Sequence, residues 1–290
     1  MKLRVADFYI DVACDENVIE YLPNLRPFVV AKEEVNEPVI CCVETGDCGI
    51  HQNESAPVYT GFLEGRTIRL WLTPDSCCFL LTFSENSYCL QANRRWTRVK
   101  TNWKSGTLES YVALNDIIML SFVYSAAFYD TAIIHASCIA IGRNGCAFVG
   151  PSSVGKSTQS SLWKEYIPGS RLLNDDQPII RFMADDGVYL YGSPWSGKTP
   201  CYHNESVGLK CLFFMEQANE NKIVRLSGIE TFQKLLKSTS LIGRDTYSFD
   251  KISKTQAKVA SYVPAFLFRN IKGKEAADLG YKTFVHCVQR

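Results

Sequence analysis

A glycine-rich segment near the middle of the chain carries the residues with the most specific chemistry. Residues 150–157 read GPSSVGKS and fit the phosphate-loop pattern GxxxxGK[ST] at every defined position. In this pattern the glycines let backbone N–H groups point at phosphate oxygens, the lysine reaches the β- and γ-phosphates, and the serine hydroxyl ligates Mg²⁺. The segment therefore predicts a site for ATP or a related nucleoside triphosphate with Mg²⁺, or with Mn²⁺ in its place. The residues expected to contact the nucleotide are Gly150, Ser152, Ser153, Val154, Gly155, Lys156, Ser157 and Thr158.

The sequence around this loop predicts the strand–loop–helix setting that phosphate binding requires. An apolar run at Cys146–Val149 precedes the loop, and a helix-prone run at Thr158–Tyr166 follows it. Another apolar run, Ala132–Ile141, comes earlier. A turn is expected at Gly142-Arg143-Asn144-Gly145, where the pair Asn144-Gly145 is a strong signal for a hairpin between the two strands. The helix after the loop would present its positive N-terminal end to the phosphates.

Two adjacent acids, Asp175 and Asp176, end an apolar run that begins at Arg171. A phosphate-transferring enzyme needs one carboxylate for the metal and often a second one for the acceptor hydroxyl. Ser157 and Asp175 are the candidate metal ligands, and both acids, together with Lys156, are candidate catalytic residues. Successive side chains of a strand point to opposite faces, so the division of the ligand and base roles between the two acids stays open.

The order of these motifs resembles a known family. His135-Ala-Ser, a hairpin, GPSSVGKST and then LNDDQ resemble the HPr kinase/phosphorylase group and its phosphoenolpyruvate-carboxykinase-like relatives, over residues 130–180. A single histidine in an apolar strand is more often structural than functional, but the resemblance implies that His135 lies near the transferring phosphate. It also implies that Lys156 and Ser157 hold the phosphates and Mg²⁺, and that the acidic pair supplies the metal ligand and the base.

The resemblance leaves the acceptor open. The N-terminal pattern and the glycine-rich signature of the hexameric enzymes are not recognisable here, which argues against HPr itself as the substrate. The leading hypothesis is an ATP-dependent kinase that moves a phosphate to a hydroxyl, such as that of serine, on a peptide, a protein or a small molecule. The alternatives are a carboxykinase-like lyase and a non-catalytic nucleotide sensor. The segment Tyr191–Lys198 is either part of a nucleotide or acceptor pocket or an ordinary polar loop.

Two domains are expected, in an α/β (α+β) fold. Residues 1–105 contain short β-prone runs separated by turns, which predicts a mostly antiparallel, β-rich N-terminal domain without a chemical motif. Residues 106–290 alternate strands with helices and would form the phosphoenolpyruvate-carboxykinase-like nucleotide-binding domain. The runs expected as N-terminal strands are Arg4–Ile10, Pro38–Val43, Val58–Phe62, Thr67–Leu72, Cys78–Phe83 and Tyr88–Gln91, and a helix is expected at about Asn115–Phe128.

Composition does not support several other classes of function. The 31 basic and 30 acidic residues give a net charge of +1, so no basic excess points to nucleic acid. The N-terminus does not resemble a signal peptide, and the longest apolar stretch, Ile117–Phe128, is too short to span a bilayer. We therefore expect a cytoplasmic protein without a membrane partner, and homo-oligomer formation stays open. The 12 cysteines include no CxxC pair, so we expect neither zinc nor a disulfide framework, and interpret most of them as small buried hydrophobic residues.

Overall fold

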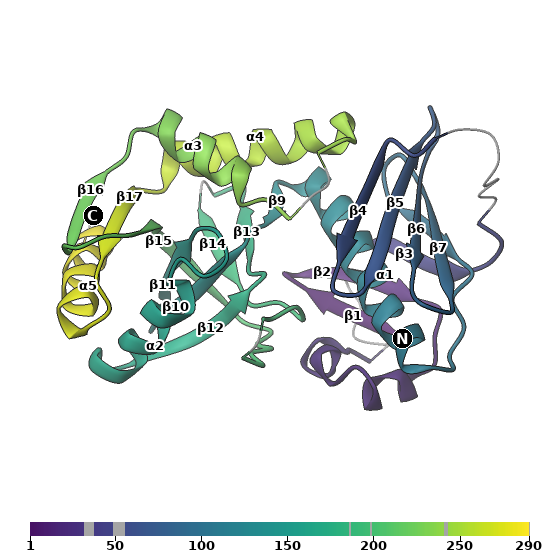
Figure 1. Cartoon of the computed structure of the whole chain (residues 1–290), viewed down its shortest axis with the longest axis horizontal. Coiled ribbons are helices and arrows are strands. Elements are labelled where there is room, and N and C mark those ends of the chain that lie inside the picture. The colour runs from purple at the N-terminus through teal and green to yellow at the C-terminus, as the bar shows by residue number, and fades with distance from the viewer. Residues whose placement is uncertain (32–37, 49–55, 186, 198, 241–242, 290) are drawn as a thin grey trace. The chain divides into compact units, whose positions relative to one another are not determined.

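The computed structural model describes residues 1–31, 38–48, 56–185, 187–197, 199–240 and 243–289. It is a mixed α/β fold with 32% helix and 38% strand and two mixed sheets. The chain forms two compact units, each built around one of the sheets (Figure 1). Unit 1 comprises Met1–Tyr129 and Ile242–Phe249, and unit 2 comprises Asp130–Leu241 and Asp250–Arg290.

Unit 1 contains an eight-stranded sheet in the order β1-β2-β3-β8-β7-β6-β5-β4. The β2–β3 and β3–β8 pairs are parallel, and the other neighbours are antiparallel. The strands are β1 (Lys2–Val5), β2 (Phe8–Val12), β3 (Val39–Thr45), β4 (Tyr59–Leu63), β5 (Arg66–Leu72), β6 (Ser76–Thr82), β7 (Ser87–Asn93) and β8 (Arg98–Thr101). The sheet is thus mixed, although most of its described pairs are antiparallel.

The run Arg4–Ile10, predicted as one strand, contains a tight turn instead. Strands β1 and β2 pair antiparallel, with Val5 opposite Phe8. The two residues between them, Ala6 and Asp7, have φ values of 48° and 63°. Left-handed backbone at both central residues is the geometry of a two-residue hairpin, and Asp adopts it more readily than most residues.

Helix α1 (Leu108–Ala126) is the core helix of unit 1. The side chain of Thr107 accepts a hydrogen bond from Ser110 N and caps the helix, so it begins seven residues before the predicted Asn115. By length and hydropathy, residues Leu108–Tyr129 could cross a membrane, but 67% of the apolar window is buried inside the structure. Tyr124 of α1 stacks on Trp96 with ring centroids 4.3 Å apart, and both are fully buried. These observations describe a helix buried in the core of unit 1.

The grouping of the chain differs from the expected division into residues 1–105 and 106–290. Helix α1 belongs to unit 1, so the change of unit follows this helix at Tyr129–Asp130 rather than preceding it. The segment Ile242–Phe249 also belongs to unit 1, which makes that unit discontinuous in sequence. Composition shifts along a chain do not reveal such a return.

Unit 2 contains a nine-stranded mixed sheet with the path β12-β10-β11-β15-β14-β13-β9, extended from β15 by β17 and then β16. The β11–β15 and β15–β17 pairs are parallel, and the other neighbours are antiparallel. The strands are β9 (Thr131–Ile133), β10 (Ala136–Ile141), β11 (Asn144–Val149), β12 (Ser170–Asp176), β13 (Ile179–Phe182), β14 (Val188–Tyr191), β15 (Ser206–Gln217), β16 (Lys222–Arg225) and β17 (Ala265–Asn270). The helices are α2 (Lys156–Tyr166), α3 (Gly228–Lys237), α4 (Thr246–Tyr262), whose first residues group with unit 1, and α5 (Lys274–Val288).

Apolar clusters cover both faces of the unit 2 sheet. Alternate residues of β11 point in opposite directions: Phe148 joins one cluster with Trp163 of α2 and Phe284 of α5. Val149 joins the other cluster, which includes Leu235 of α3 and residues of α4. Because strand residues alternate between faces, helices from both sides can hold β11 in the middle of the core. The loop that follows β11 therefore starts from a rigid position.

The hairpin before the glycine-rich loop turns within the predicted stretch 142–145, at its first two residues and not at the Asn144-Gly145 pair. Ile141 pairs with Asn144, so the two-residue turn is Gly142-Arg143, with Gly142 at φ 57°. Gly145 lies within β11, where a Cβ atom would meet Val207 Cγ2 at 2.5 Å. This glycine is therefore explained by close packing rather than by the turn. The predicted strand Ala132–Ile141 is also interrupted, because Ile134 and His135 lie between β9 and β10.

One cysteine pair departs from the expectation. Cys48 and Cys89 form a disulfide in unit 1, whereas we expected no disulfide framework and interpreted most cysteines as buried hydrophobic residues. The other ten cysteines are free, and eight of them are buried. Burial raises the pKa of the Cys138 and Cys211 thiols well above the ordinary value, as for small hydrophobic residues of a core.

Candidate functional site

The glycine-rich loop, residues 150–155, connects β11 to α2 in unit 2. Gly155 has φ 108° and precedes the first residue of α2, and Ser153 also has a positive φ of 65°. Within the described residues no side chain caps α2, so the first N–H groups of this helix remain available to an anion. Ser152 and Ser153 are exposed on the loop, and Val154 and Gly155 are half-buried. The predicted nucleotide contacts thus form one continuous turn that ends in the helix with Lys156, Ser157 and Thr158.

Lys156 is buried, and its ammonium group is fully engaged. Its Nζ donates to Gly150 O at 2.9 Å and to Pro151 O at 3.0 Å, and lies 2.8 Å from His135 Nε2. An ammonium group has three donors, and these three acceptors use them all. Burial lowers the pKa of Lys156, while the charges of the two nearby aspartates oppose this shift.

His135 is held from three directions. Its backbone N–H donates to Ser238 O at 2.7 Å, and its Nδ1 lies 2.8 Å from Asp176 Oδ1. Because the ammonium of Lys156 can only donate, Nε2 must accept, and the ring proton then lies on Nδ1 and points at Asp176. The side chain is 33% exposed, so one edge of the imidazole faces solvent. The hydrogen-bond geometry therefore makes Nδ1 the donor to Asp176 and Nε2 the acceptor from Lys156.

Asp176 ends β12 in a backbone conformation with φ 133°, outside the usual range for a residue with a side chain. Burial of its carboxylate would raise its pKa. The hydrogen bond from His135, together with the hydrogen bond from Gln177 and the charge of Lys156, outweighs burial and lowers the pKa of Asp176. The carboxylate is therefore held in its charged form beside the imidazole.

Asp175 has a different partner from its neighbour. The hydroxyl of Ser157 donates to Asp175 Oδ1 at 2.9 Å, and Asp175 is buried. Strand β12 pairs with β10 so that Asp175 lies opposite Ser137 and Asp176 opposite Ala136. Since successive side chains of a strand diverge, the acidic pair divides between Ser157 and His135, as the strand geometry allowed.

The oxygens of Ser157 and Asp175 fit a hard divalent cation. A hydroxyl and a carboxylate suit Mg²⁺ or Mn²⁺, and Mg²⁺ commonly keeps water and phosphate oxygens as its other ligands. The described part of the chain has no group of three or more His, Cys, Asp or Glu side chains that could hold a metal by themselves. A metal held by these two side chains would need further oxygen ligands, such as water, to complete its coordination.

Asn174 is a site residue that sequence reasoning did not identify. It is fully buried, its Nδ2 donates to Trp195 O at 3.0 Å and Ser193 Oγ at 3.2 Å, and its Oδ1 accepts from Gln177 N at 2.9 Å. A single amide thus joins the end of β12 to the segment that follows β14. The only signal was its place in the string LNDDQ, where we considered the two acids alone.

The segment Tyr191–Lys198 lies against the backbone of the acidic pair. Gly197 N donates to Asp175 O at 2.5 Å, and Ser196 Oγ donates to the same oxygen at 3.1 Å. A Cβ atom on Gly197 would come within 3.2 Å of Asp176 Cβ, so a small residue is favoured there. Lys198 lies outside the described residues. The segment is therefore part of the surroundings of the site.

Gln177 and Ser240 form a further contact around Asp176. Ser240 Oγ donates to Gln177 Oε1 at 2.5 Å, and Gln177 Nε2 donates to Asp176 Oδ2 at 3.4 Å. On the other side of the site, Gln217 Nε2 donates to Ser153 O at 3.0 Å and ties the loop to the end of β15. These amides come from segments far apart in the sequence, which is why sequence patterns do not reveal them.

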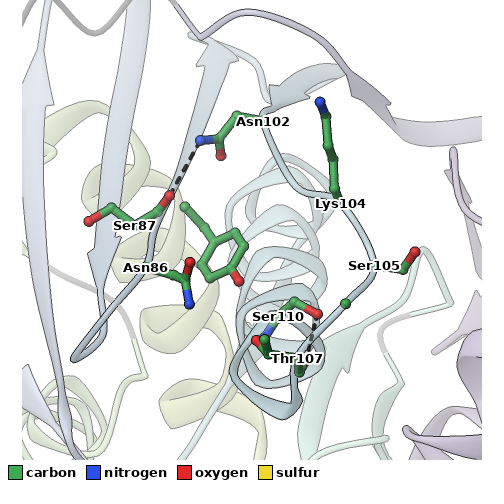
Figure 2. Close-up of a pocket in the computed structure, with 9 residues that line it drawn as sticks. Asn86, Ser87, Asn102, Lys104, Ser105, Thr107 and Ser110 are labelled. Carbon is green, nitrogen blue, oxygen red and sulfur yellow. Dashed lines mark hydrogen bonds between the residues drawn. The ribbon is translucent and has the colours of Figure 1, made fainter.

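A separate cavity of about 270 Å³ lies in unit 1, next to the first turn of α1. Figure 2 shows polar side chains around it, including Lys104 and Asn102, and the dashed hydrogen bond from Asn102 to Ser87 O, which is 3.3 Å long. Its lining residues are Asn86, Ser87, Tyr88, Asn102, Lys104, Ser105, Gly106, Thr107 and Ser110. None of them belongs to the glycine-rich loop or to the acidic pair.

No protein-family model matches the sequence, and no curated protein matches it significantly. The resemblance to the HPr kinase/phosphorylase group therefore rests on the motifs of residues 130–180 alone.

Proposed function

We propose that this protein is an ATP-dependent phosphotransferase of the HPr-kinase-related type, which moves the γ-phosphate of ATP to a hydroxyl group. One observation carries the proposal. The contacts Ser157–Asp175 and Lys156–His135–Asp176 lie side by side, sharing the first turn of α2 and the end of β12. These are the parts that phosphoryl transfer needs: a phosphate cradle, a place for a metal, and a polar group for the acceptor.

The nucleotide would bind along the glycine-rich loop. The N-terminal end of α2 and the backbone N–H groups of residues 150–155 favour an anion. Lys156 would exchange its carbonyl partners, Gly150 and Pro151, for phosphate oxygens, which bind an ammonium group more strongly. Mg²⁺ would be held by Ser157 and Asp175, and it would offset the charge of the phosphates.

The acceptor hydroxyl would lie beside the His135–Asp176 pair. Asp176 is held in its charged form and can orient a hydroxyl group and take its proton as transfer completes. The metal-ligand role then belongs to Asp175 and the base role to Asp176, a division based on their different partners. The acceptor class remains a hydroxyl on a peptide, a protein or a small molecule.

Calorimetric titration with ATP and Mg²⁺ tests whether the glycine-rich loop binds the nucleotide. Lys156→Ala should weaken ATP binding about tenfold or more, because a charge-assisted contact contributes roughly 1.5–3 kcal/mol. Lys164→Ala, at an exposed position in the last turn of α2, is the matched control and should leave affinity unchanged. Equal affinity of the parent and Lys156→Ala for ATP would contradict the proposed site.

Transfer itself is tested by incubating the protein with γ-labelled ATP, Mg²⁺ and candidate acceptors: serine-containing peptides, proteins and small alcohols. We expect label to appear on an acceptor hydroxyl as an acid-stable phosphate ester. If ATP binds but no acceptor in a broad panel is labelled, the sensor hypothesis replaces the kinase.

A further inference from the structure

Gln177 joins three segments of the chain that surround Asp176. Its backbone N–H donates to Asn174 Oδ1 at 2.9 Å, and its carbonyl accepts from Ser193 Oγ at 2.6 Å. In its side chain, Oε1 accepts from Ser240 Oγ at 2.5 Å, and Nε2 donates to Asp176 Oδ2 at 3.4 Å. Each of its four polar groups therefore has a partner, and these partners come from β12, from the segment after β14 and from the segment after α3.

The backbone of Gln177 is fixed independently of its side chain. Pro178 follows it and restricts residue 177 to an extended backbone, and the contacts with Asn174 and Ser193 use its N–H and its carbonyl. Asp176, just before it, has φ 133°, a conformation that persists only where the surrounding structure determines it. The amide of Gln177 therefore reaches the carboxylate from a fixed backbone, and truncating the side chain leaves the backbone contacts in place.

The carboxylate of Asp176 has one donor on each oxygen. Oδ1 lies 2.8 Å from His135 Nδ1, and Oδ2 accepts from Gln177 Nε2 at 3.4 Å. Two donors on different oxygens oppose rotation of the carboxylate, whereas a single donor would leave it free to turn about that one hydrogen bond. An ionised carboxylate has about four lone-pair sites, so both oxygens can still accept a hydrogen bond from a hydroxyl group.

The short segment after α3 supports both of these donors. Ser238 O accepts from the backbone N–H of His135 at 2.7 Å, and Ser240 Oγ donates to Gln177 Oε1 at 2.5 Å. The two serines are separated by a single residue. One stretch of chain therefore fixes the imidazole and the amide that hold the Asp176 carboxylate.

We propose that Gln177 is a positioning residue that orients the Asp176 carboxylate toward the acceptor hydroxyl, and that Ser240 acts through Gln177. The inference rests on the proposed function and deepens it, because it concerns the residues that hold the base and not those that hold the nucleotide. Among the hydrogen bonds of the described residues, none joins Gln177 to the glycine-rich loop. Loss of its side chain should therefore slow transfer and leave ATP binding unchanged, since displacing a reacting group by about 1 Å can cost about 10²-fold in rate.

Gln177→Ala in the full-length protein tests the positioning role by separating kcat from KM. With γ-labelled ATP, Mg²⁺ and the acceptor that the parent labels, we expect kcat to fall by about 10–10²-fold, while the KM for ATP changes by less than about twofold. Gln233→Ala is the matched control, because it truncates an exposed glutamine of α3 in the same unit, and it should keep the parental kcat. An unchanged kcat in Gln177→Ala, or a loss confined to the KM for ATP, would overturn the inference.

Ser240 is tested by its conservative variant and by a double-mutant cycle. Ser240→Ala should reduce kcat in the same direction as Gln177→Ala and by a smaller factor, and Ser240→Thr should restore the parental kcat because it keeps the hydroxyl. The double variant should be no slower than Gln177→Ala alone, since Ser240 acts through that side chain. If the two losses multiply instead, Ser240 does not act through Gln177.

A spectroscopic measurement separates this inference from the proposed function, because it needs neither ATP nor an acceptor. The ¹⁵N resonance of His135 Nδ1, recorded at one neutral pH, reports the hydrogen bond to Asp176. We expect this resonance to shift in Gln177→Ala, where the carboxylate can turn, and to keep its parental position in Gln233→Ala. If the parent transfers no phosphate but the resonance shifts, the proposed function fails and the support of the carboxylate by Gln177 stands. An unshifted resonance would overturn the inference, whatever the parent transfers.

Discussion

The hydroxyl of Ser157 donates to Asp175 Oδ1 across 2.9 Å and joins the first turn of α2 to the end of β12. Two oxygens held at this distance by a helix and a strand need little rearrangement to share a cation. Folding has therefore already ordered these two side chains, so that cation binding loses little further conformational entropy there. The relationship makes the metal dependence of nucleotide binding the most direct test of the site.

Asp175→Asn should reduce the contribution of Mg²⁺ to ATP affinity by about tenfold or more, because a neutral amide is a weaker ligand for a hard cation. The measurement is ATP affinity as a function of Mg²⁺ concentration, and with EDTA present parent and variant should converge. Asp185→Asn, at an exposed turn, is the control and should behave as the parent. A parent whose ATP affinity ignores EDTA would show that no metal takes part.

Asp176 should make the stability of the folded chain depend on pH in a defined window. Its folded-state pKa is lowered, so its contribution is fully present above the unfolded-state pKa of about 4 and is lost as pH falls through the folded-state value. Urea unfolding of the parent and Asp176→Asn should therefore differ by a constant free energy near pH 5, with the difference shrinking toward pH 3. If the difference in unfolding free energy between the parent and Asp176→Asn grew as pH falls, the pKa of Asp176 would not be lowered in the folded state.

Asn174→Ala should destabilise the protein and slow transfer without weakening ATP binding. Removing the buried amide leaves Trp195 O and Gln177 N without that partner, and each unsatisfied group costs about 1–3 kcal/mol. The segment that supports the acidic pair would loosen, while the loop that cradles the phosphates is tied elsewhere, through Gln217. Thermal unfolding and ATP calorimetry on the same samples measure the two effects, and unchanged stability would contradict the role.

The sequence predicted the structure well where the signal lies within a few neighbouring residues. Alternation and apolar runs predicted most strands of both units, and the glycine-rich loop lies between β11 and α2 as expected. The hairpin before it turns inside the predicted stretch 142–145, but at Gly142-Arg143. The Asn144-Gly145 pair does not form the turn, and packing against Val207 explains Gly145. The preference of an Asn-Gly pair for a turn was outweighed by the packing of Gly145 against Val207, a tertiary contact that sequence patterns do not reveal.

The residues of the site could be predicted from the sequence, but their hydrogen-bond partners could not. Lys156, Ser157, His135 and the acidic pair do come together, but which acid contacts which partner depends on the register of β12 against β10. The support from Asn174 depends on a segment beyond β14, which no spacing rule links to β12. The Cys48–Cys89 disulfide was missed for a similar reason, since it joins two residues 41 positions apart whose proximity depends on the fold.

A buried ion pair in unit 1 tests the fold independently of nucleotide chemistry. Arg66 of β5 and Asp116 of α1 are both buried, with Nη2 2.8 Å from Oδ1 and Nε 2.5 Å from Oδ2. Burial raises the pKa of Asp116, and the charge and hydrogen bond of Arg66 oppose that shift. Each charge therefore depends on its partner in a region of low polarity.

Asp116→Asn should lower the free energy of unfolding by about 3–5 kcal/mol, because it leaves a buried guanidinium without a counter-charge. The double variant Arg66→Met with Asp116→Leu should recover most of that loss, since apolar residues of similar size fill the space without an unpaired charge. Arg4→Ala, which removes an exposed pair with Asp7, is the control and should cost less than about 1 kcal/mol. Urea unfolding, together with hydrogen exchange of peptides from α1, locates the effect in unit 1. If Asp116→Asn is no more destabilising than Arg4→Ala, the pair is not desolvated as the structure describes, and the packing of α1 against β5 would need revision.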